Sequence, residues 1–296
     1  MKKFTLVLFF MPVLLFALEK KTQFQWLNAI YASGGLETKM VLSYSERYPF
    51  LQGEGVLTKN NSFTWRVFGE ISPVSFNAGG EVSLTPLAIL VLQWGAKVGT
   101  GWKLLDFTGL ALNPLFNTNA AQTPTSFGGA VFEGWVTGAL QFDTGAVIPG
   151  DWTHVLFYMG HTLDYRYFTL ADDNTPWLYE ADQGRNYNGW KYMTTSVIAY
   201  QMPLWLRNVG VLVSTTTRLS HRDDSVMANH GWGSDFTEWV FGPLVFMEGG
   251  DHSLTVLVQW FTDEVYSEES GHFTTYRYEG TEVKPYRIAL SYSYNW

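Results

Sequence analysis

The last eleven residues of the chain, YRIALSYSYNW (286–296), carry a large apolar side chain at every second position. Successive side chains leave opposite faces of a β-strand, so a period of two predicts a strand with one apolar and one polar face. In a soluble sandwich the apolar face would point into a core. In a membrane barrel it would point into lipid, and the small polar face would line the interior.

The same alternation recurs along the rest of the chain. In SFTWRVFGEIS (62–72) and VSFNAGGEVSL (74–84), charged residues sit mid-strand on the polar face only. This dyad pattern predicts an all-β fold, an antiparallel transmembrane β-barrel of about twelve strands, with lipid-facing residues such as Val67, Val82, Val256 and Leu290. The expected strands are 36–46, 51–59, 62–72, 74–84, 88–100, 130–142, 153–168, 190–202, 209–220, 236–246, 252–262 and 284–296.

Three of these strands fit the pattern less well. The segment 51–59 is rich in glycine, and 236–246 contains Pro243. In 153–168, His161 falls on the nominally apolar face. A β-bulge, which inserts one residue and shifts the parity, would repair that strand.

The N-terminus predicts export. A basic start is followed by the apolar run FTLVLFFMPVLLFAL (4–18), which suits a signal-peptide core and is too short to span a bilayer as a helix. Cleavage after Ala17 makes residues 1–17 the signal peptide, and an uncleaved anchor is the alternative. Residues 18–35 are then expected to be a periplasmic segment or short plug, and 36–296 the barrel.

Composition narrows the partners. Charged residues are 16% of the chain and aromatic residues 17%, a shortage of charge that is explained if much of the surface faces lipid. The formal net charge of −8 becomes −10 without Lys2 and Lys3 (17 basic against 27 acidic), so no basic face for nucleic acid is expected. Cysteine is absent, which removes disulfides and thiolate metal sites. No cofactor and no metal are predicted.

The connections alternate in length. Working back from the C-terminus, those at 247–251, 203–208, 143–152, around Pro86 and at Asn60-Asn61 are short. Those at 263–283, 221–235, 169–189 and 101–129 are long, and the short ones at 47–50 and around Pro73 are exceptions. Short turns on one side and long loops on the other are typical of outer-membrane barrels. Tryptophans flank both sides, which predicts two interfacial girdles: Trp152, Trp205 and Trp296 near the turns, and Trp102, Trp190, Trp232 and Trp260 near the loops.

The final strand, with Tyr292, Tyr294 and Trp296 on its apolar face, resembles the C-terminal signature of bacterial outer-membrane β-barrel proteins. The resemblance is at the level of the class. It implies residence in the outer membrane of a diderm bacterium, contact with outer-membrane lipid, and recognition of this strand by the barrel-assembly machinery.

Strand parity places a set of charged residues of both signs in the interior. About 8 strands leave an interior just filled by side chains, and 16–18 strands leave an open channel. Twelve strands fall between these numbers, so both a narrow polar channel and an interior closed by salt bridges are possible. The favoured function is a porin-like passive channel for small hydrophilic solutes, in which charge sets selectivity. The predicted pore-lining residues are Glu37, Lys39, Arg66, Glu70, Glu81, Lys97, Glu133, Asp164, Arg166, Lys191, Arg218, Glu238 and Arg287.

Other functions place their residues in loops. A hydrolase would draw on His221, Asp223, Asp224, Asn229, His230, Ser234 and Asp235, but no matching constellation of acid, base and nucleophile appears in the neighbouring strands. Ca²⁺ binding by the pairs Asp172-Asp173 and Asp223-Asp224 lacks the spacing of a known motif. A loop-borne adhesin or receptor would use the aromatic segment 169–190, with Trp177, Tyr179, Tyr187 and Trp190, to stack on a ligand.

Overall fold

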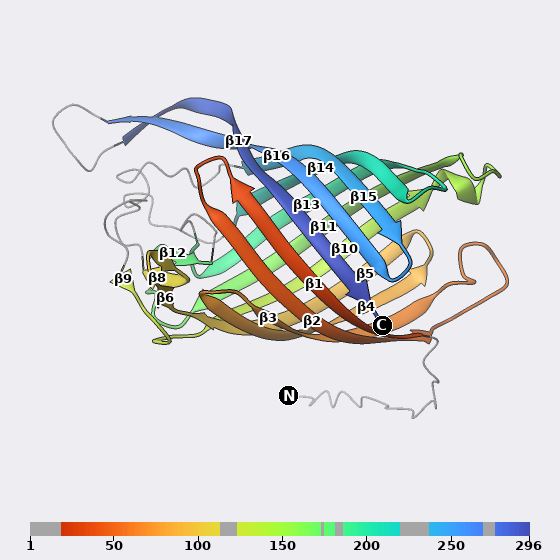
Figure 1. Cartoon of the computed structure of the whole chain (residues 1–296), viewed down its shortest axis with the longest axis horizontal. Coiled ribbons are helices and arrows are strands. Elements are labelled where there is room, and N and C mark those ends of the chain that lie inside the picture. Colours follow the sequence, from red (N-terminus) through yellow and green to blue (C-terminus); the bar gives the residue numbers. More distant parts are fainter. Residues whose placement is uncertain (1–18, 113–122, 173–174, 181–185, 220–236, 269–275) are drawn as a thin grey trace, which may run out of the picture.

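In the computed structural model, twelve antiparallel strands close into a barrel (Figure 1). The structure describes residues 19–112, 123–172, 175–180, 186–219, 237–268 and 276–296. The order around the wall is β1-β17-β16-β15-β14-β13-β11-β10-β5-β4-β3-β2. The bounds are β1 Glu19–Tyr31, β2 Leu36–Pro49, β3 Ser62–Ile71, β4 Ser75–Leu87, β5 Leu90–Gly101, β10 Val131–Asp143, β11 His154–Phe168, β13 Gly189–Gln201, β14 Leu206–Arg218, β15 Thr237–Gly249, β16 His252–Glu268 and β17 Tyr276–Asn295.

The barrel closes between its first and last strands. β1 pairs with β17 from Gln23↔Asn295 to Tyr31↔Arg287. Just beyond that ladder, the backbone N–H of Thr22 donates to the carbonyl of Trp296 at 3.1 Å, and the N–H of Trp296 donates back at 3.0 Å. Closure satisfies the backbone groups that an open sheet would leave unpaired, which a wall in lipid requires. The predicted fold is confirmed.

Two strand assignments from the sequence were wrong, and their errors cancel in the count. Residues 18–35 were expected to precede the barrel, but Glu19–Tyr31 forms β1 in the wall. Residues 51–59 were expected to be a strand, but they form turns between β2 and β3, with the Thr58 N–H donating to the Gly55 carbonyl at 2.9 Å. The glycines that weakened the alternation there favour a turn. Residues 1–17 lie outside the described residues.

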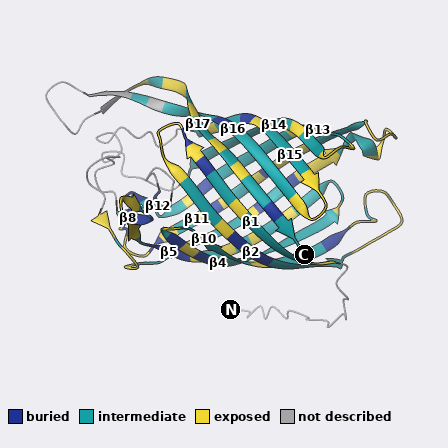
Figure 2. Ribbon diagram, viewed as in Figure 1, coloured by how far each residue is buried: buried dark blue, intermediate teal, exposed yellow. Residues whose placement is uncertain are grey.

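The outer surface of the wall is apolar. Figure 2 shows exposed and less exposed residues alternating along the strands. Val67 and Leu290 are exposed on the outer face, and Val82 and Val256 share that face through their ladder partners. Large exposed rings lie at both ends of the wall, among them Trp152, Trp205 and Trp296 at the turn end and Trp190 at the loop end. This distribution suits a wall in lipid between two interfaces.

No helix within the described ranges is long and apolar enough to cross a membrane.

His161 lies on the outer face without any bulge. The ladders of β11 with β10 and with β13 run through His161 without a register shift, so the expected bulge is absent there. The His161 ring instead shares a hydrogen bond of 2.6 Å with the Tyr192 hydroxyl on the neighbouring strand. A hydrogen-bonded partner lowers the cost of a polar group in an apolar setting, so the strand keeps its regular parity.

The two ends of the barrel differ, as the connection lengths predicted. The turn end carries connections 50–61, 88–89, 144–153 (with η1, Thr144–Ala146), 202–205 and 250–251. The short connection expected at 47–50 is absent, because β2 continues to Pro49 and the connection after it lies at the turn end. At the loop end, the connections 32–35 and 72–74 are short and remain exceptions to the pattern. The loop end holds small strands in two connections: β6 Lys103–Leu104, β7 Phe107–Thr108, β8 Leu110–Leu112, β9 Thr123–Pro124 and β12 Trp177–Tyr179.

Candidate functional site: a lumen narrowed by two loops

The charged residues predicted to line the interior share the inner face of the wall. Ladder partners such as Arg66↔Glu81, Glu133↔Lys97 and Asp164↔Lys191 keep this parity from strand to strand. The pairing of Lys191 with Arg218, and the ladder from β14 to β15, place Arg218 and Glu238 on the inner face as well. The remaining residues of the set lie on the inner faces of β2, β3, β11 and β17. Whether these side chains line a conducting path stays a prediction.

Two of the loops fold into the barrel mouth. β12, β8 and β9 form a small sheet, and its residues Leu110, Trp177 and Tyr179 are buried. They pack with Val131 and Phe168, which belong to the inner faces of β10 and β11. This apolar cluster holds the small sheet inside the mouth.

Glycines on the inner face of β5 make room for these loops. A Cβ atom at Gly99 would lie 2.3 Å from the Tyr179 hydroxyl, and one at Gly101 would lie 2.9 Å from the Cβ of Leu110. Both separations are too short for real side chains, so the loops can approach the wall only where the wall carries glycine.

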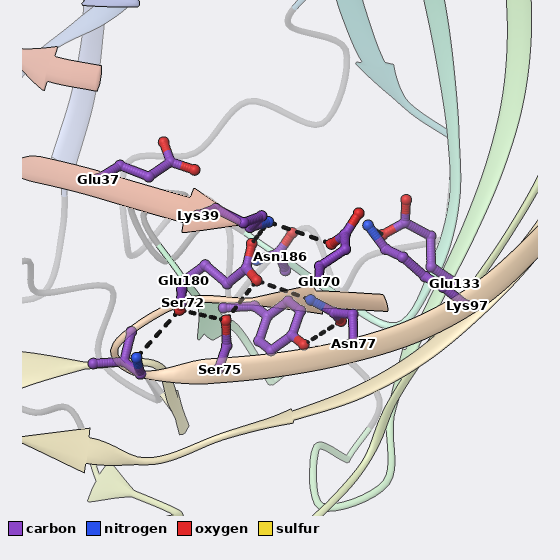
Figure 3. A network of polar contacts seen from close by, with 12 residues as sticks. Glu37, Lys39, Glu70, Ser72, Ser75, Asn77, Lys97, Glu133, Glu180 and Asn186 are labelled. Atoms are coloured by element: carbon purple, nitrogen blue, oxygen red, sulfur yellow. Dashed lines mark hydrogen bonds and ion pairs between the residues drawn. The ribbon is translucent and has the colours of Figure 1, made fainter. Parts of the chain in front are cut away.

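One segment of the connection between β11 and β13 crosses the lumen. We call residues 177–180 together with Asn186 the strap. At one end of the strap, the Glu180 carboxylate accepts hydrogen bonds from Lys39 Nζ at 2.5 Å, from the Ser75 hydroxyl at 2.7 Å and from the Asn77 amide at 3.0 Å (Figure 3). The Tyr179 hydroxyl also donates to Asn77 Oδ1, at 2.5 Å. This end is therefore fixed to β2 and β4.

Asn186 fixes the other end of the strap to β11 and β13. Its side-chain oxygen accepts hydrogen bonds from Arg166 Nη1 at 3.2 Å and from Lys191 Nζ at 2.9 Å. Trp177 and Asn186 exchange backbone hydrogen bonds of 3.0 and 3.1 Å, which tie the two ends together. Because β2 and β4 are separated from β11 and β13 by other strands, the strap narrows the mouth.

The surroundings of Glu180 favour its charged form. Burial by itself raises the pKa of this carboxyl, but the nearby Lys39 ammonium and the hydrogen bonds from Lys39 and Ser75 outweigh burial, and the net direction is downward. Glu180 also adopts a left-handed backbone conformation, with φ of 57°, which is uncommon for a residue other than glycine. Its three charge-assisted hydrogen bonds offset that strain.

Ion pairs cover the inner wall beneath the strap. Arg66 contacts Glu81 at 3.2 Å, in the register expected from the turn near Pro73, which also pairs Glu70 with Asn77. Lys39 contacts Glu70 at 3.5 Å. A second group of ion pairs joins three strands: Glu133 lies 3.4 Å from Lys97 Nζ and 3.0 Å from Arg166 Nε, and Arg166 Nε lies 3.3 Å from Asp164. We call the inner faces of β2–β5, β10, β11 and β13 the charged wall.

The rest of the inner surface is of a different kind. On β1 and β14–β17, the inner side chains between the two ends of the barrel are uncharged: hydroxyl, amide and small side chains lie among apolar ones such as Leu212, Leu244 and Leu257. Gln25 donates to Ser291 at 2.8 Å, and Gln23 donates to Asn295 at 2.9 Å. Charged members lie toward the ends, such as Arg287, which contacts Glu37 at 3.5 Å. We call this surface the neutral wall.

The aromatic loop does not offer the stacking platform expected of an adhesin. Trp177 is 0% exposed, and Tyr179 and Tyr187 are also buried, because these rings fill the barrel mouth. Trp190 is exposed, but it lies on the outer face of β13 beside Tyr165. The hydrolase candidates at 221–235, as well as Trp232 and Asp173, lie outside the described residues. Among the residues that are described, no group of three acidic or histidine side chains could hold a metal ion.

The most connected residues of the site were missed by the sequence analysis. Glu180, Asn77 and Asn186 link the strap to the wall, yet only the strand alternation around Asn77 carried a signal. A carboxylate or an amide in a loop has no periodicity that would reveal its partners.

These observations define the class: a transmembrane antiparallel β-barrel whose lumen is narrowed by its own loops. No protein-family profile matches the chain, and no curated protein matches it. Among solved structures, it is similar to the KdgM porin in complex with disordered oligogalacturonate, with a TM-score of 0.37 and 10% identity, over 93% of this chain and 98% of that one.

Two further solved structures resemble the chain. The translocator domain of the autotransporter NalP from Neisseria meningitidis has a TM-score of 0.35 and 12% identity, over 93% of this chain and 87% of that one. OccK11 (OpdR) from Pseudomonas aeruginosa has a TM-score of 0.23 and 11% identity, over 94% and 95%. The matches are to outer-membrane β-barrels, as the sequence pattern implied. At these scores they carry no argument about activity, which has to come from the residues of this chain.

Proposed function

We propose that the protein is a passive channel for small hydrophilic solutes in the outer membrane of a diderm bacterium. The observation that carries this proposal is the unequal lining of the lumen. The hydrogen bonds described for the strap fix it to the charged wall, on β2, β4, β11 and β13. Hydroxyl and amide groups along that wall suit water and uncharged polar solutes.

A closed barrel with a loop-borne binding role is the second candidate. It is favoured by the strap itself, whose buried contacts at Glu180 and Asn186 tie both ends to the wall. A hydrolase has no support among the described residues, and we propose no enzymatic activity. In either case the partners are outer-membrane lipid and, through Tyr292, Tyr294 and Trp296, the barrel-assembly machinery.

Conductance of the purified protein in planar bilayers separates the two candidates. Stepwise openings of uniform size, present without any added ligand, support the channel. A correctly folded barrel that stays silent over a range of voltages and salts contradicts it and favours the closed barrel. Folding is checked on the same sample by β-rich circular dichroism and by the change in gel migration on heating.

Arg66→Ala tests whether the charged wall governs passage. The substitution removes the cation that faces Glu81, so that the carboxylate is left without this partner. Conductance should rise and selectivity should shift toward cations, with the change shrinking at 1 M salt, where the Debye length is about 3 Å. Ser291→Ala, on the neutral wall, is the control and should leave selectivity unchanged. If Arg66→Ala alters neither quantity at low salt, Arg66 does not line the path.

A further inference from the structure

A large cavity opens at the loop end of the barrel, between the strap and the neutral wall. Its volume is about 1040 Å³, and it is bounded by the tips of the β1–β2 and β3–β4 hairpins, the β6–β7 hairpin, the strap and the upper parts of β16 and β17. Sites for small organic molecules usually have volumes of about 300–1,000 Å³. The cavity is thus large enough for a whole small molecule, and it lies at the entrance of the proposed channel.

The lining of this cavity is mostly apolar. The β6–β7 hairpin contributes Leu104, Leu105 and Phe107, and the strap contributes Leu178. Leu105 is 79% exposed and has φ of 54°, in the left-handed region where glycine or asparagine is usual. Turn tips in water seldom combine strained backbone with a large apolar side chain. The combination is explained if the side chain has an apolar contact to make.

Three aromatic rings form the opposite side. The Tyr31 and Tyr286 rings meet edge to face with centroids 5.4 Å apart, and the Phe261 and Tyr286 rings lie 5.0 Å apart. The Arg287 guanidinium lies 4.9 Å from the Tyr286 ring centroid and 5.6 Å from that of Tyr31, which holds both rings in place. Rigid rings of this kind bind other rings by stacking and edge contacts at little cost in conformational entropy.

The charged groups of the lining already have partners. Glu37 accepts a hydrogen bond of 2.7 Å from the Tyr31 hydroxyl and lies 3.5 Å from Arg287. Lys39 is held by Glu180. Lys284 Nζ lies 3.0 Å from Asp263. A charged ligand would have to compete with these pairs, whereas a neutral one would leave them intact.

We infer that this cavity binds an uncharged molecule that has an aromatic or similarly flat apolar body and polar groups at its edge. Its apolar body would lie between the β6–β7 hairpin and the three rings, and its polar edge would face the ion pairs at the base. Binding itself does not depend on conduction. The further step, that such molecules are solutes of the channel, rests on the proposed function.

The test uses the full barrel in lipid nanodiscs and equilibrium dialysis, with empty nanodiscs to measure uptake by the lipid. The probe is 4-nitrophenyl glucoside, a neutral aromatic ring linked to a sugar, and glucose is the counterpart that lacks the aromatic ring. We expect saturable binding of one probe per barrel, at least tenfold tighter than that of glucose. Phe107→Ser and Leu178→Ser should each weaken binding about tenfold, a change equivalent to about 1.4 kcal/mol.

Phe127→Ser is the matched control. Phe127 is an exposed aromatic residue of the same connection, with φ of 53°, but it stacks on Trp102 and is not part of the cavity lining. Its substitution should leave binding unchanged. Equal weakening by all three substitutions, uptake no greater than that of empty nanodiscs, or tighter binding of 4-nitrobenzoate than of the neutral probe would each overturn the inference.

Conductance measured on the same preparation keeps the two proposals apart. A barrel that binds the probe but stays silent contradicts the proposed channel and leaves the binding site standing. A barrel that conducts but binds no probe contradicts the binding site alone. If both hold, the probe should interrupt the current at lower concentration when added on the loop side than on the turn side.

Discussion

The charged wall and the neutral wall belong to one sheet and one lumen, but they are stabilised differently. On the charged wall, side chains such as Lys39 and Glu133 contact residues on two or more neighbouring elements, and Lys39 also holds the strap. On the neutral wall, hydroxyl and amide groups bond in pairs, as Gln25 does with Ser291. The first arrangement fixes a loop across the lumen. The second leaves hydroxyl and amide groups on the wall that can form hydrogen bonds with water or solutes.

The two walls also differ in what they contribute to the structure. The neutral wall contains the seam between β1 and β17, where the chain closes on itself. The charged wall contains the contacts that set the width of the mouth. Closure and constriction can therefore be changed one at a time, and the following predictions do so in order of decreasing effect.

Deleting Trp296 should have the largest effect, on closure. Trp296 exchanges two backbone hydrogen bonds with Thr22 and stacks on Tyr294, so its loss shortens the seam and removes the terminal ring of the last strand. The amount of folded, heat-modifiable protein in the outer membrane should fall sharply. Trp205→Ala, which removes another exposed ring at the turn end, is the control. Equal, mild losses in both would mean that Trp296 acts only as an interfacial ring.

Lys39→Met should have the next largest effect, on constriction. It leaves the carboxylates of Glu70 and Glu180 without the cation between them. Removing one partner of a buried pair typically costs about 3–5 kcal/mol. The free energy of unfolding, measured by denaturant titration in vesicles, should fall by that order, and open-channel conductance should rise as the strap loosens.

The matched substitution on the neutral wall is Gln25→Ala. It removes one neutral hydrogen bond, which is worth about 1 kcal/mol, and touches nothing in the strap. If Gln25→Ala destabilises the barrel as much as Lys39→Met does, the proposed division of labour between the two walls is wrong.

Acidification should produce the smallest effect, confined to low pH. Because the pKa of Glu180 is lowered in the folded protein, its contribution to holding the strap is complete above the ordinary glutamate pKa of about 4.3. That contribution is lost only as the pH falls through the lowered value. Conductance should stay level from pH 7 to 5 and rise reversibly below about pH 4. Glu180→Gln, already loosened at pH 7, should show a smaller rise.

Most of the wall could be predicted from the sequence, because lipid outside and water inside impose a period of two on each strand. The pairing of Arg66 with Glu81 followed from that period and from one turn near Pro73. β1 was missed because its faces are mixed, with Leu27 and Ala29 inside and Asn28 outside, where Asn28 bonds to Thr38. The false strand at 51–59 alternates only through its glycines.

The strap could not be predicted in the same way. Its position depends on contacts between Glu180 and residues more than a hundred positions earlier in the chain, such as Asn77 and Ser75. These contacts depend on how the loop packs against the wall. Glycines on β5 leave space for the loop, and burial of an apolar cluster stabilises the loop inside the mouth. Neither effect leaves a periodic trace in the sequence.

The hairpin of β16 and β17 rises beyond the rest of the wall (Figure 1). Past Phe261, β16 has no ladder to β15, and past Arg287 toward its N-terminal end, β17 has none to β1, so the upper part of each strand pairs only with the other. Extra residues placed in this part would disturb none of the described contacts that close the barrel or hold the strap. The hairpin is therefore the natural place to graft a foreign peptide at the loop end of the barrel.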